Sequence, residues 1–288
     1  MNVWVTGSAG MLGTALCRQL KNKGISFIDT DKGTDITCQA TVDNFLKNNP
    51  TITHIVNCAG YTQVDKAEEE TQLAHAINAI GPQNLGIGAN KYGLHITHIS
   101  TDYVFDGNSN TPYLEDSPCR PLGVYAQTKW EGEQKLLHAC SEACIIRTSW
   151  LFGLNGKNFV STMLQLMKDK EVLRVVVDQV GRPTFCDDLS DAIIALLNHK
   201  GIFHFANHGA TSWHAFASSI ADMGKKHHYP IKVKTILPIS TIEYPTPAKR
   251  PLYSVLDTTK IKKTLKYHPR TWQEALSDYL LQYHKERR

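Results

Sequence analysis

The chain begins Met1-Asn2-Val3-Trp4-Val5-Thr6-Gly7-Ser8-Ala9-Gly10-Met11-Leu12-Gly13, and this stretch decides which fold we expect. A short apolar run passes directly into a glycine-rich turn, and the residues after the turn have the apolar spacing of a helix. We therefore predict a strand at Asn2–Thr6 and a helix at Gly10–Lys23. A strand, a glycine turn and a helix in this order indicate the first unit of a parallel α/β sheet.

The glycines of this turn suggest a dinucleotide site. One glycine permits the tight turn, one lets the backbone approach a pyrophosphate, and one lets helix and strand pack closely. The helix N-terminus then offers unpaired N–H groups to the phosphates. Glycines at this spacing also occur in purely structural turns, but the strand before and the helix after favour dinucleotide binding. The residues predicted to contact the cofactor here are Gly7, Gly10, Met11, Leu12 and Gly13.

Charged residues follow the second predicted strand, Ser26–Ile28, where the adenosine ribose is expected. Asp29 and Asp31 are carboxylates, which suit the free 2′-hydroxyl of NAD, whereas Lys32 is a cation, which suits the 2′-phosphate of NADP. Alternatively, these side chains only solvate the end of the strand. Because Asp31 and Lys32 oppose each other, we expect both NADH and NADPH to be used, with NADPH slightly favoured.

Strand-like and helix-like segments alternate through the first two-thirds of the chain, which predicts an α/β fold with a Rossmann-like doubly wound parallel sheet. The further strands are expected at His54–Asn57, Leu94–Ser100, Ala143–Arg147, Val172–Val177 and Gly201–Phe205. The further helices are expected at Val42–Asn48, Glu68–Tyr92, Tyr125–Cys140 and Asp187–Asn198.

The C-terminal third has a different composition, because half of the 12 prolines fall between Pro230 and Pro269. We predict a dinucleotide-binding domain over residues 1–150 and a smaller substrate-binding lobe over residues 151–288. Part of the segment 172–206 is expected to return to the first domain.

The composition is that of an ordinary globular protein, with 42% hydrophobic and 20% charged residues in a chain of 288. No apolar run reaches the ~18 residues that cross a bilayer, and no basic region precedes the first strand, so we expect a cytoplasmic protein without a membrane partner. The net charge of +4 is small, and the basic clusters Lys262-Lys263 and Lys285-Glu286-Arg287-Arg288 are expected to be solvated surface rather than a nucleic-acid site. The seven cysteines lack metal-ligand spacing and are expected to be free thiols.

Three side chains point to proton-transfer chemistry. Tyr125 and Lys129 are four residues apart, so in a helix they share one face. A nearby cation stabilises a phenolate and so lowers the pKa of a tyrosine, which makes it a usable acid or base. The hydroxyl of Thr101, at the end of a predicted strand, can orient a carbonyl oxygen. A Tyr–Lys pair alone is more often surface, but together with the glycine turn the three residues predict a catalytic set.

With these residues the sequence resembles the extended short-chain dehydrogenase/reductases and, among them, the dTDP-4-dehydrorhamnose reductases, over nearly the whole chain. Seven ordered blocks carry the resemblance: Val56–Glu68, Ser100–Gly107, Val124–Lys129, Arg147–Trp150, Asp178–Thr184, Thr211–His214 and Tyr244–Pro251.

The resemblance implies reduction of the 4-keto group of dTDP-4-dehydro-L-rhamnose by NADPH or NADH. It implies that Tyr125 protonates the developing alkoxide, that Lys129 lowers the pKa of Tyr125 and binds the nicotinamide ribose, and that Thr101 hydrogen-bonds the carbonyl oxygen. Residues after the third strand are expected to border the cofactor, namely Ala59, Tyr61 and Thr62. The sugar is expected to contact Val64, Asp102, Tyr103 and Trp150, and the diphosphate Arg182 and Arg250.

The sequence departs from this family at one point. Some members form dimers bridged by Mg²⁺ through glutamates, but here the helix after the glycine turn has Ala15 at that place, and Asp187 stands where another carboxylate is expected. We therefore predict no metal ligands and leave open whether the protein is a monomer or a homodimer.

Two other functions remain possible at this point. One is a non-catalytic regulatory subunit resembling that of methionine adenosyltransferase, and the other is a sugar-nucleotide epimerase on the same scaffold.

Overall fold

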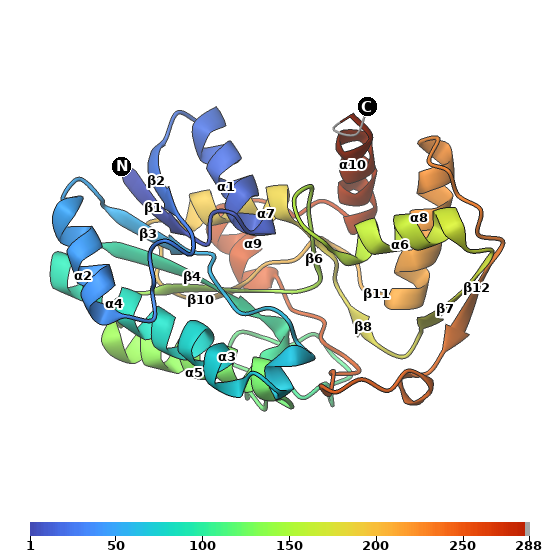
Figure 1. Cartoon of the computed structure of the whole chain (residues 1–288), viewed down its shortest axis with the longest axis horizontal. Coiled ribbons are helices and arrows are strands. Elements are labelled where there is room, and N and C mark those ends of the chain that lie inside the picture. The colour runs from blue at the N-terminus through green and yellow to red at the C-terminus, as the bar shows by residue number, and fades with distance from the viewer. Residues whose placement is uncertain (286–288) are drawn as a thin grey trace.

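A six-stranded parallel sheet forms the core of the left-hand part of the molecule in Figure 1, in a computed structural model that describes residues 1–285. The strand order is β10-β5-β4-β3-β1-β2, and every neighbouring pair is parallel. The strands are β1 (Asn2–Thr6), β2 (Ser26–Thr30), β3 (His54–Asn57), β4 (His95–Thr101), β5 (Cys144–Thr148) and β10 (Gly201–His204). The predicted α/β class with a Rossmann-like doubly wound sheet is confirmed. Residues 286–288 of the predicted basic tail lie outside the described part.

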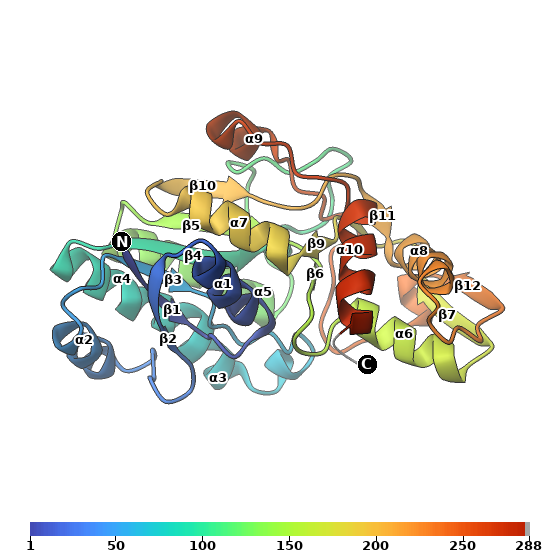
Figure 2. The same cartoon turned by 90° about the horizontal axis from the view of Figure 1, so that it is seen from above.

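Helices cover both faces of this sheet because its strands are apolar on both sides. Val3 and Val5 pack with α1 and α7 on one face, and Trp4 between them packs with α2, α4 and α5 on the other (Figure 2). The helices are α1 (Met11–Asn22), α2 (Gln39–Asn48), α3 (Thr71–His75), α4 (Gly81–Tyr92), α5 (Val124–Ala139), α7 (Cys186–Leu196) and α9 (Thr259–Leu265). Among the described helices, none is both long and apolar enough to cross a membrane.

A second apolar core lies beside the sheet, on the right of Figure 1. It is built by α6 (Phe159–Asp169), α8 (Trp213–Lys226) and α10 (Trp272–Lys285), together with the parallel pair of β7 (Val172–Val176) and β12 (Thr235–Ile239). Two short strand pairs lie between the cores: β6 (Leu151–Phe152) with β9 (Thr184–Phe185), and β8 (Val180–Gly181) with β11 (Thr211–Ser212). Within the segment 172–206, therefore, β7 belongs to the lobe, whereas β10 pairs with β5 of the central sheet.

The expected helix Glu68–Tyr92 is observed from Thr71 to Tyr92, later than its predicted start and with a π turn in it. A separate 3₁₀ turn at Lys66–Glu68 precedes it, and the helix itself consists of α3, the π turn at Ala76–Ile80 and α4. Within the π turn, the buried Asn78 accepts a hydrogen bond from the Tyr61 N–H (2.8 Å) and donates one to the Tyr61 carbonyl (3.0 Å). A π turn inserts one residue into a helix, and here the insertion directs the Asn78 amide at the loop after β3.

The parallel arrangement also determines where the site is. The carboxyl ends of β1, β3, β4 and β5 meet at one edge of the sheet, and the second core lies beyond that edge (Figure 2). Two short 3₁₀ turns, Asp102–Val104 and Thr241–Glu243, follow β4 and β12 respectively. Ligands of such sheets bind beyond the carboxyl ends of the strands.

The contact between α5 and the π turn gives a stability prediction. A Cβ atom added to Gly132 would lie 2.0 Å from the Asn78 carbonyl oxygen, which is backbone and cannot move aside easily. We expect Gly132→Ala to lower the free energy of unfolding by ~1–3 kcal/mol, as overpacking does. Gly33→Ala is the control, because nothing lies within 4 Å of its added Cβ. Urea unfolding checks both variants, and equal midpoints for Gly132→Ala and the unmodified protein would contradict the expectation.

Candidate active site

Two adjoining cavities lie at the carboxyl edge of the sheet, with volumes of about 390 and 410 Å³. They share the residues Gly10, Cys58, Ala59 and Gly60, so they form one continuous groove. The first cavity, which we call the reaction cavity, is lined by most of the predicted catalytic, cofactor and sugar residues: Gly10, Met11, Leu12, Ala59, Thr62, Val64, Thr101, Asp102, Tyr103, Tyr125, Lys129 and Trp150. The second, which we call the ribose cavity, is lined by Gly7, Gly10, Asp31, Lys32 and Ala59 among others.

The glycine turn forms a cradle that no larger residue could form. Gly7 has φ +67°, and an added Cβ would lie 2.6 Å from the backbone nitrogen of Ala59. A Cβ on Gly13 would lie 2.2 Å from the Gly7 carbonyl oxygen, so Gly13 packs inside the turn instead of lining the groove. Gly10 caps α1 without a side-chain hydrogen bond, and the first turn of α1 has no acidic residue. The first N–H groups of α1 are therefore free to bind an anion, and the cradle fits the pyrophosphate of a dinucleotide.

The charged pair at the end of β2 lies at the far end of this groove. Asp31 and Lys32 are both exposed and both line the ribose cavity. Asp29 is also exposed, on β2 itself, but it does not line that cavity. The structure thus brings the Lys32 ammonium and the Asp31 carboxylate to the place where the cofactor ribose was predicted, and a second carboxylate, Asp35, also lines this cavity.

Thr101, Tyr125 and Lys129 meet in the reaction cavity. Thr101 is the last residue of β4, and Tyr125 and Lys129 lie one turn apart near the start of α5. Burial raises the pKa of Tyr125 to about 12, the hydrogen bond with Thr101 acts in the opposite direction, and nearby Asp102 raises it further. Burial also lowers the pKa of Lys129 to about 8. The Lys129 ammonium donates to the Ile99 carbonyl oxygen (2.6 Å), so it is directed at β4, and it does not offset the rise in the Tyr125 pKa.

Asp102 is the second acid in this cavity. Its side chain is buried, Thr101 donates a hydrogen bond to its Oδ1 (3.2 Å), and the Ser254 side chain also interacts with the carboxyl. Burial raises the pKa of this carboxyl to about 7. A carboxyl accepts hydrogen bonds when it is ionised and also donates one when it is protonated, so Asp102 can do either near neutral pH.

Two tryptophans form the wall on the side of the second core. The rings of Trp150 and Trp213 stack with their centroids 3.5 Å apart and 7° between their planes. Trp150 has φ +48°, which is unusual for a residue with a side chain, and a Cβ on Gly181 would lie 2.6 Å from its ring. Trp213 donates its ring N–H to Gln179 (3.2 Å). Trp213 also lines a neighbouring cavity of about 380 Å³, so it stands between that cavity and the reaction cavity.

Three other predicted residues do not line the groove. The Tyr61 ring is buried and its hydroxyl donates to Glu70 (2.5 Å). Arg182 directs its guanidinium at the Leu256 carbonyl oxygen (2.8 Å) and lines neither cavity of the groove. Arg250 lines the cavity behind Trp213 and forms an ion pair with Asp65 (2.8 Å). The roles assigned to these residues stay predictions.

The carboxylate at the predicted metal position is engaged by a cation. Asp187, at the start of α7, forms an ion pair with Arg18 of α1. Within residues 1–285 no group of three His, Cys, Asp or Glu side chains could hold a metal ion.

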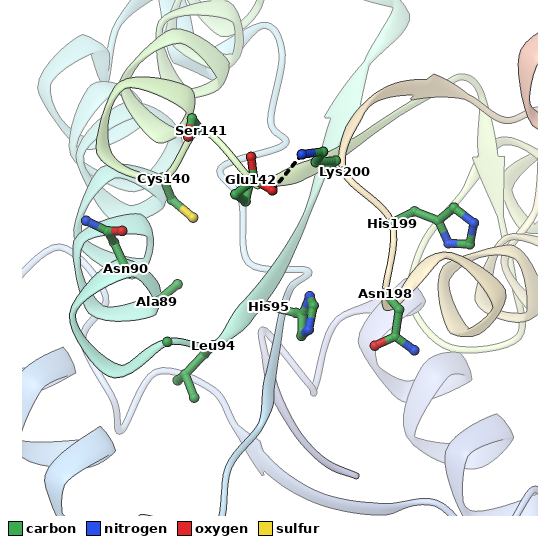
Figure 3. A pocket seen from close by; sticks show the side chains of 11 residues that line it. Ala89, Asn90, Leu94, His95, Cys140, Ser141, Glu142, Asn198, His199 and Lys200 are labelled. Carbon is green, nitrogen blue, oxygen red and sulfur yellow. Dashed lines mark hydrogen bonds and ion pairs between the residues drawn. The ribbon is translucent and has the colours of Figure 1, made fainter.

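A roomier cavity of about 600 Å³ lies near the opposite, amino-terminal edge of the sheet (Figure 3). It is bordered by His95 at the start of β4 and by an ion pair between Glu142 and Lys200 (2.8 Å). None of the predicted site residues lines it, so its size alone does not mark the site of chemistry.

Sequence reasoning missed three residues that shape the site. Trp213 lies within the block Thr211–His214 that carries the family resemblance, but the sequence gives no sign that its ring will stack on Trp150. Asn57 ends β3 and His98 lies inside β4. Their available signal is a polar residue next to apolar ones, since a buried polar side chain needs a partner.

The parallel sheet, the glycine cradle and a Thr–Tyr–Lys set in one cavity are together the features of the extended short-chain dehydrogenase/reductases. A model of the family described as RmlD substrate binding domain matches residues 1–285. The chain belongs to this family, and the resemblance noted in the sequence is confirmed.

Similar proteins come from several bacteria. The chain is 42% identical over 281 residues to the spore coat polysaccharide biosynthesis protein SpsK of Bacillus subtilis, and the match covers 96% of each chain. A crystal structure of a dTDP-4-dehydrorhamnose reductase from Clostridium acetobutylicum is 41% identical, with a TM-score of 0.91 over 98% of this chain and 100% of that one. The dTDP-4-dehydrorhamnose reductase of Bacillus anthracis in complex with NADP is 35% identical, with a TM-score of 0.92 over 98% and 99% of the two chains.

The raised pKa of Asp102 gives a prediction about stability and pH. From the ordinary pKa of 3.8 up to about 7, the folded protein keeps a proton that the unfolded chain releases, so this residue lowers the free energy of unfolding as the pH rises. Asparagine cannot ionise. We therefore expect the free energy of unfolding of Asp102→Asn, relative to that of the unmodified protein, to rise by ~2–4 kcal/mol between about pH 4 and pH 8. Denaturant unfolding at several pH values measures this difference.

Asp106→Asn is the control of opposite sign. The Asn108 backbone N–H holds the pKa of Asp106 below its usual value, so this carboxylate stabilises the fold above that value. Asp106→Asn is therefore expected to have a lower free energy of unfolding than the unmodified protein at the higher pH. A parallel pH dependence of Asp102→Asn and the unmodified protein would show that Asp102 ionises normally.

Proposed function

We propose that the protein is an oxidoreductase of nucleotide-sugar biosynthesis that uses NADPH or NADH to reduce the 4-keto group of dTDP-4-dehydro-L-rhamnose, giving dTDP-L-rhamnose. The observation that carries this proposal is the continuous groove that joins the glycine cradle to Thr101, Tyr125 and Lys129. The names of the two similar solved structures support the substrate, and the NADP complex supports a nicotinamide cofactor.

The cradle of Gly7 and Gly10 with the N-terminus of α1 would hold the pyrophosphate, and Ala59 and Thr62 would border the cofactor beyond it. When bound, the nicotinamide supplies the hydride for the sugar carbonyl carbon. Asp31 and Lys32 would face the adenosine ribose, where their charges act in opposite directions on a 2′-phosphate.

The chain's own residues would handle the oxygen and its proton. Thr101 would donate a hydrogen bond to the sugar carbonyl oxygen, and Tyr125 would give its phenolic proton to that oxygen as negative charge develops. The pKa of about 12 keeps Tyr125 protonated at neutral pH, which a proton donor requires. Lys129, as a cation, would bind the ribose hydroxyls and favour the phenolate that the transfer leaves.

The wall of Trp150 and Trp213 would face the 6-deoxysugar. An aromatic surface suits the apolar methyl carbon of such a sugar, while Asp102 and Tyr103 supply polar contacts to its hydroxyl groups. The cavity behind Trp213 would receive the nucleotide diphosphate, because Arg174 and Arg250 line it. Arg182 lies further away against Leu256, so Arg250 is the better supported of the two arginines first assigned to the diphosphate.

A coupled assay tests this function. The purified protein is given dTDP-glucose that a dehydratase and an epimerase have converted to the 4-keto sugar, and NADPH consumption is followed with product identification. Consumption of NADPH with formation of dTDP-L-rhamnose supports the proposal. Absence of turnover would favour a regulatory binding protein, and tightly held cofactor that is regenerated within each cycle would favour an epimerase.

The oligomeric state and the cytoplasmic location remain predictions.

Removing the Tyr125 hydroxyl is expected to abolish most of the reduction. Tyr125→Phe keeps the ring and removes only the proton donor, so kcat should fall ~10²–10⁴-fold while cofactor binding stays nearly unchanged. Tyr92→Phe is the matched control, because Tyr92 lies at the exposed end of α4. Single-turnover rates and cofactor titration check both variants, and rapid chemistry in Tyr125→Phe would remove Tyr125 from the mechanism.

The two charges at the ribose cavity are expected to oppose each other in cofactor choice. The unmodified enzyme should use both cofactors, with NADPH modestly favoured. Lys32→Ala should move the ratio of kcat/KM values toward NADH, because the carboxylate of Asp31 then repels a 2′-phosphate unopposed. Asp31→Ala should move the ratio toward NADPH. Strict use of one cofactor, or an unchanged ratio in both variants, would show that neither residue reads the ribose.

A further inference from the structure

A chain of four buried polar side chains crosses the sheet beneath the reaction cavity. The Thr6 hydroxyl on β1 donates to the Asn57 Oδ1 on β3 (2.7 Å). The Asn57 Nδ2 lies 3.0 Å from the His98 Nδ1 on β4, and the His98 Nε2 lies 3.3 Å from the Lys129 Nζ on α5. All four side chains are at most 5% exposed, so their hydrogen bonds must be satisfied within the protein.

A backbone N–H group fixes the direction of this chain. The Asn57 Oδ1 also accepts from the Ala59 N–H (3.0 Å), and a backbone N–H can only donate. The oxygen of the amide therefore faces Ala59, and its NH₂ group faces the Nδ1 of His98. Since an amide nitrogen only donates, the His98 Nδ1 must be the acceptor and carries no proton.

The tautomer of His98 follows. Burial alone lowers the pKa of His98 well below its usual value, so the ring is neutral. A neutral ring without a proton on Nδ1 has it on Nε2, the atom that faces Lys129. The Nε2–H can bond only to a lone pair, and Nζ has one only as an amine. With an ammonium, two donors would face each other.

We propose that His98, held in its Nε2–H tautomer by Asn57, is a positioning residue that stabilises the uncharged amine of Lys129. The Nζ then donates to the Ile99 carbonyl oxygen and accepts from His98. Every hydrogen bond in the chain runs in the same direction, from Thr6 to Lys129, and such chains reinforce each other.

The other charged groups around Lys129 do not reverse this effect. Glu133, one turn further along α5, acts to raise the pKa of Lys129, but its carboxylate is bound by the buried Arg147 of β5 (2.7 Å). The Cys58 thiol, after β3, has a pKa raised by burial, so it is uncharged. Tyr125, one turn earlier on α5, is protonated at neutral pH. Burial therefore dominates, and the pKa of Lys129 lies at about 8.

The consequence for the reaction rests on the proposed function. If the Lys129 cation is needed for reduction, kcat/KM should fall as the pH rises through the pKa of Lys129, because the ammonium exists below that value and the amine above it. His98 would then determine where this alkaline limb lies.

The first test needs no substrate, and a variant serves only to assign the signals. Nitrogen-15 NMR of the histidine-labelled protein distinguishes a protonated ring nitrogen from a bare one, and the His98 signals are assigned by their loss in His98→Gln. We expect a neutral His98 with its proton on Nε2 between about pH 6 and pH 9. A proton on Nδ1, or on both nitrogens, in the unmodified protein would overturn the proposal.

The second test measures Lys129 itself. In protein labelled with carbon-13 at the lysine Cε, the Lys129 signal is assigned by its loss in Lys129→Met and followed through a pH titration. Glutamine at position 98 can turn a carbonyl oxygen toward Nζ, so His98→Gln should raise the titration midpoint by about one pH unit or more. Asn57→Asp should act in the same direction, because a carboxylate beside Nδ1 draws the ring proton there and makes Nε2 an acceptor.

His95→Gln is the matched control, on the same strand but at its exposed beginning, where the ring stacks on His54. The control should leave the Lys129 midpoint unchanged, and an unchanged midpoint in folded His98→Gln would overturn the proposal. The coupled assay runs in parallel. Failure of reduction with the expected NMR results refutes the proposed function alone, whereas reduction with an Nδ1–H tautomer refutes this inference alone.

Discussion

The contact on which the site depends is the approach of the Gly7 backbone to the residue that follows β3. An added Cβ on Gly7 would lie 2.6 Å from both the nitrogen and the Cα of Ala59, a separation that no side chain tolerates. This contact holds the turn between β1 and α1 against the end of β3, and it leaves the first N–H groups of α1 exposed at the edge of the sheet. The reaction and ribose cavities join at this place, and the turn itself contributes Gly10 to both.

A second constraint acts on the helix that carries Tyr125 and Lys129. Glu133 of α5 is fully buried, accepts from Arg147 of β5 through both carboxylate oxygens, and also accepts from Ser100 of β4. Through Arg147 and Ser100, therefore, Glu133 joins α5 to β5 and β4 one turn away from Lys129. Loss of one partner from a buried ion pair costs ~3–5 kcal/mol, because the other charge is left uncompensated. The same helix therefore carries polar groups that fix its place and polar groups that can do chemistry.

The substrate side of the groove depends on contacts between the sheet and the second core. Trp150 follows β5 and stacks on Trp213 at the start of α8. The sheet and the second core therefore each contribute one tryptophan to the same wall of the reaction cavity. The ion pair of Arg250 with Asp65 links the proline-rich loop after β12 to the loop after β3. The site is thus shaped by segments about 180 residues apart in sequence, as the hydrogen bond from the Ala248 N–H to Asp65 also shows.

The sequence by itself determined the parts that depend on local geometry. Strand and helix periodicity predicted the α/β fold and most elements of the sheet, because side-chain spacing of two or 3.6 residues reflects which face is buried. The shared face of Tyr125 and Lys129, four residues apart on α5, was predictable for the same reason, and the glycine turn was predictable because only glycine lets the backbone turn and approach so closely. The tertiary structure alone decided which long-range partners these residues meet. It paired β7 with β12, inserted a π turn into the predicted helix, turned Arg182 toward Leu256, and placed His98 against Lys129. These outcomes depend on burial and hydrogen-bond partners contributed by distant segments, and local sequence periodicity contains no information about them.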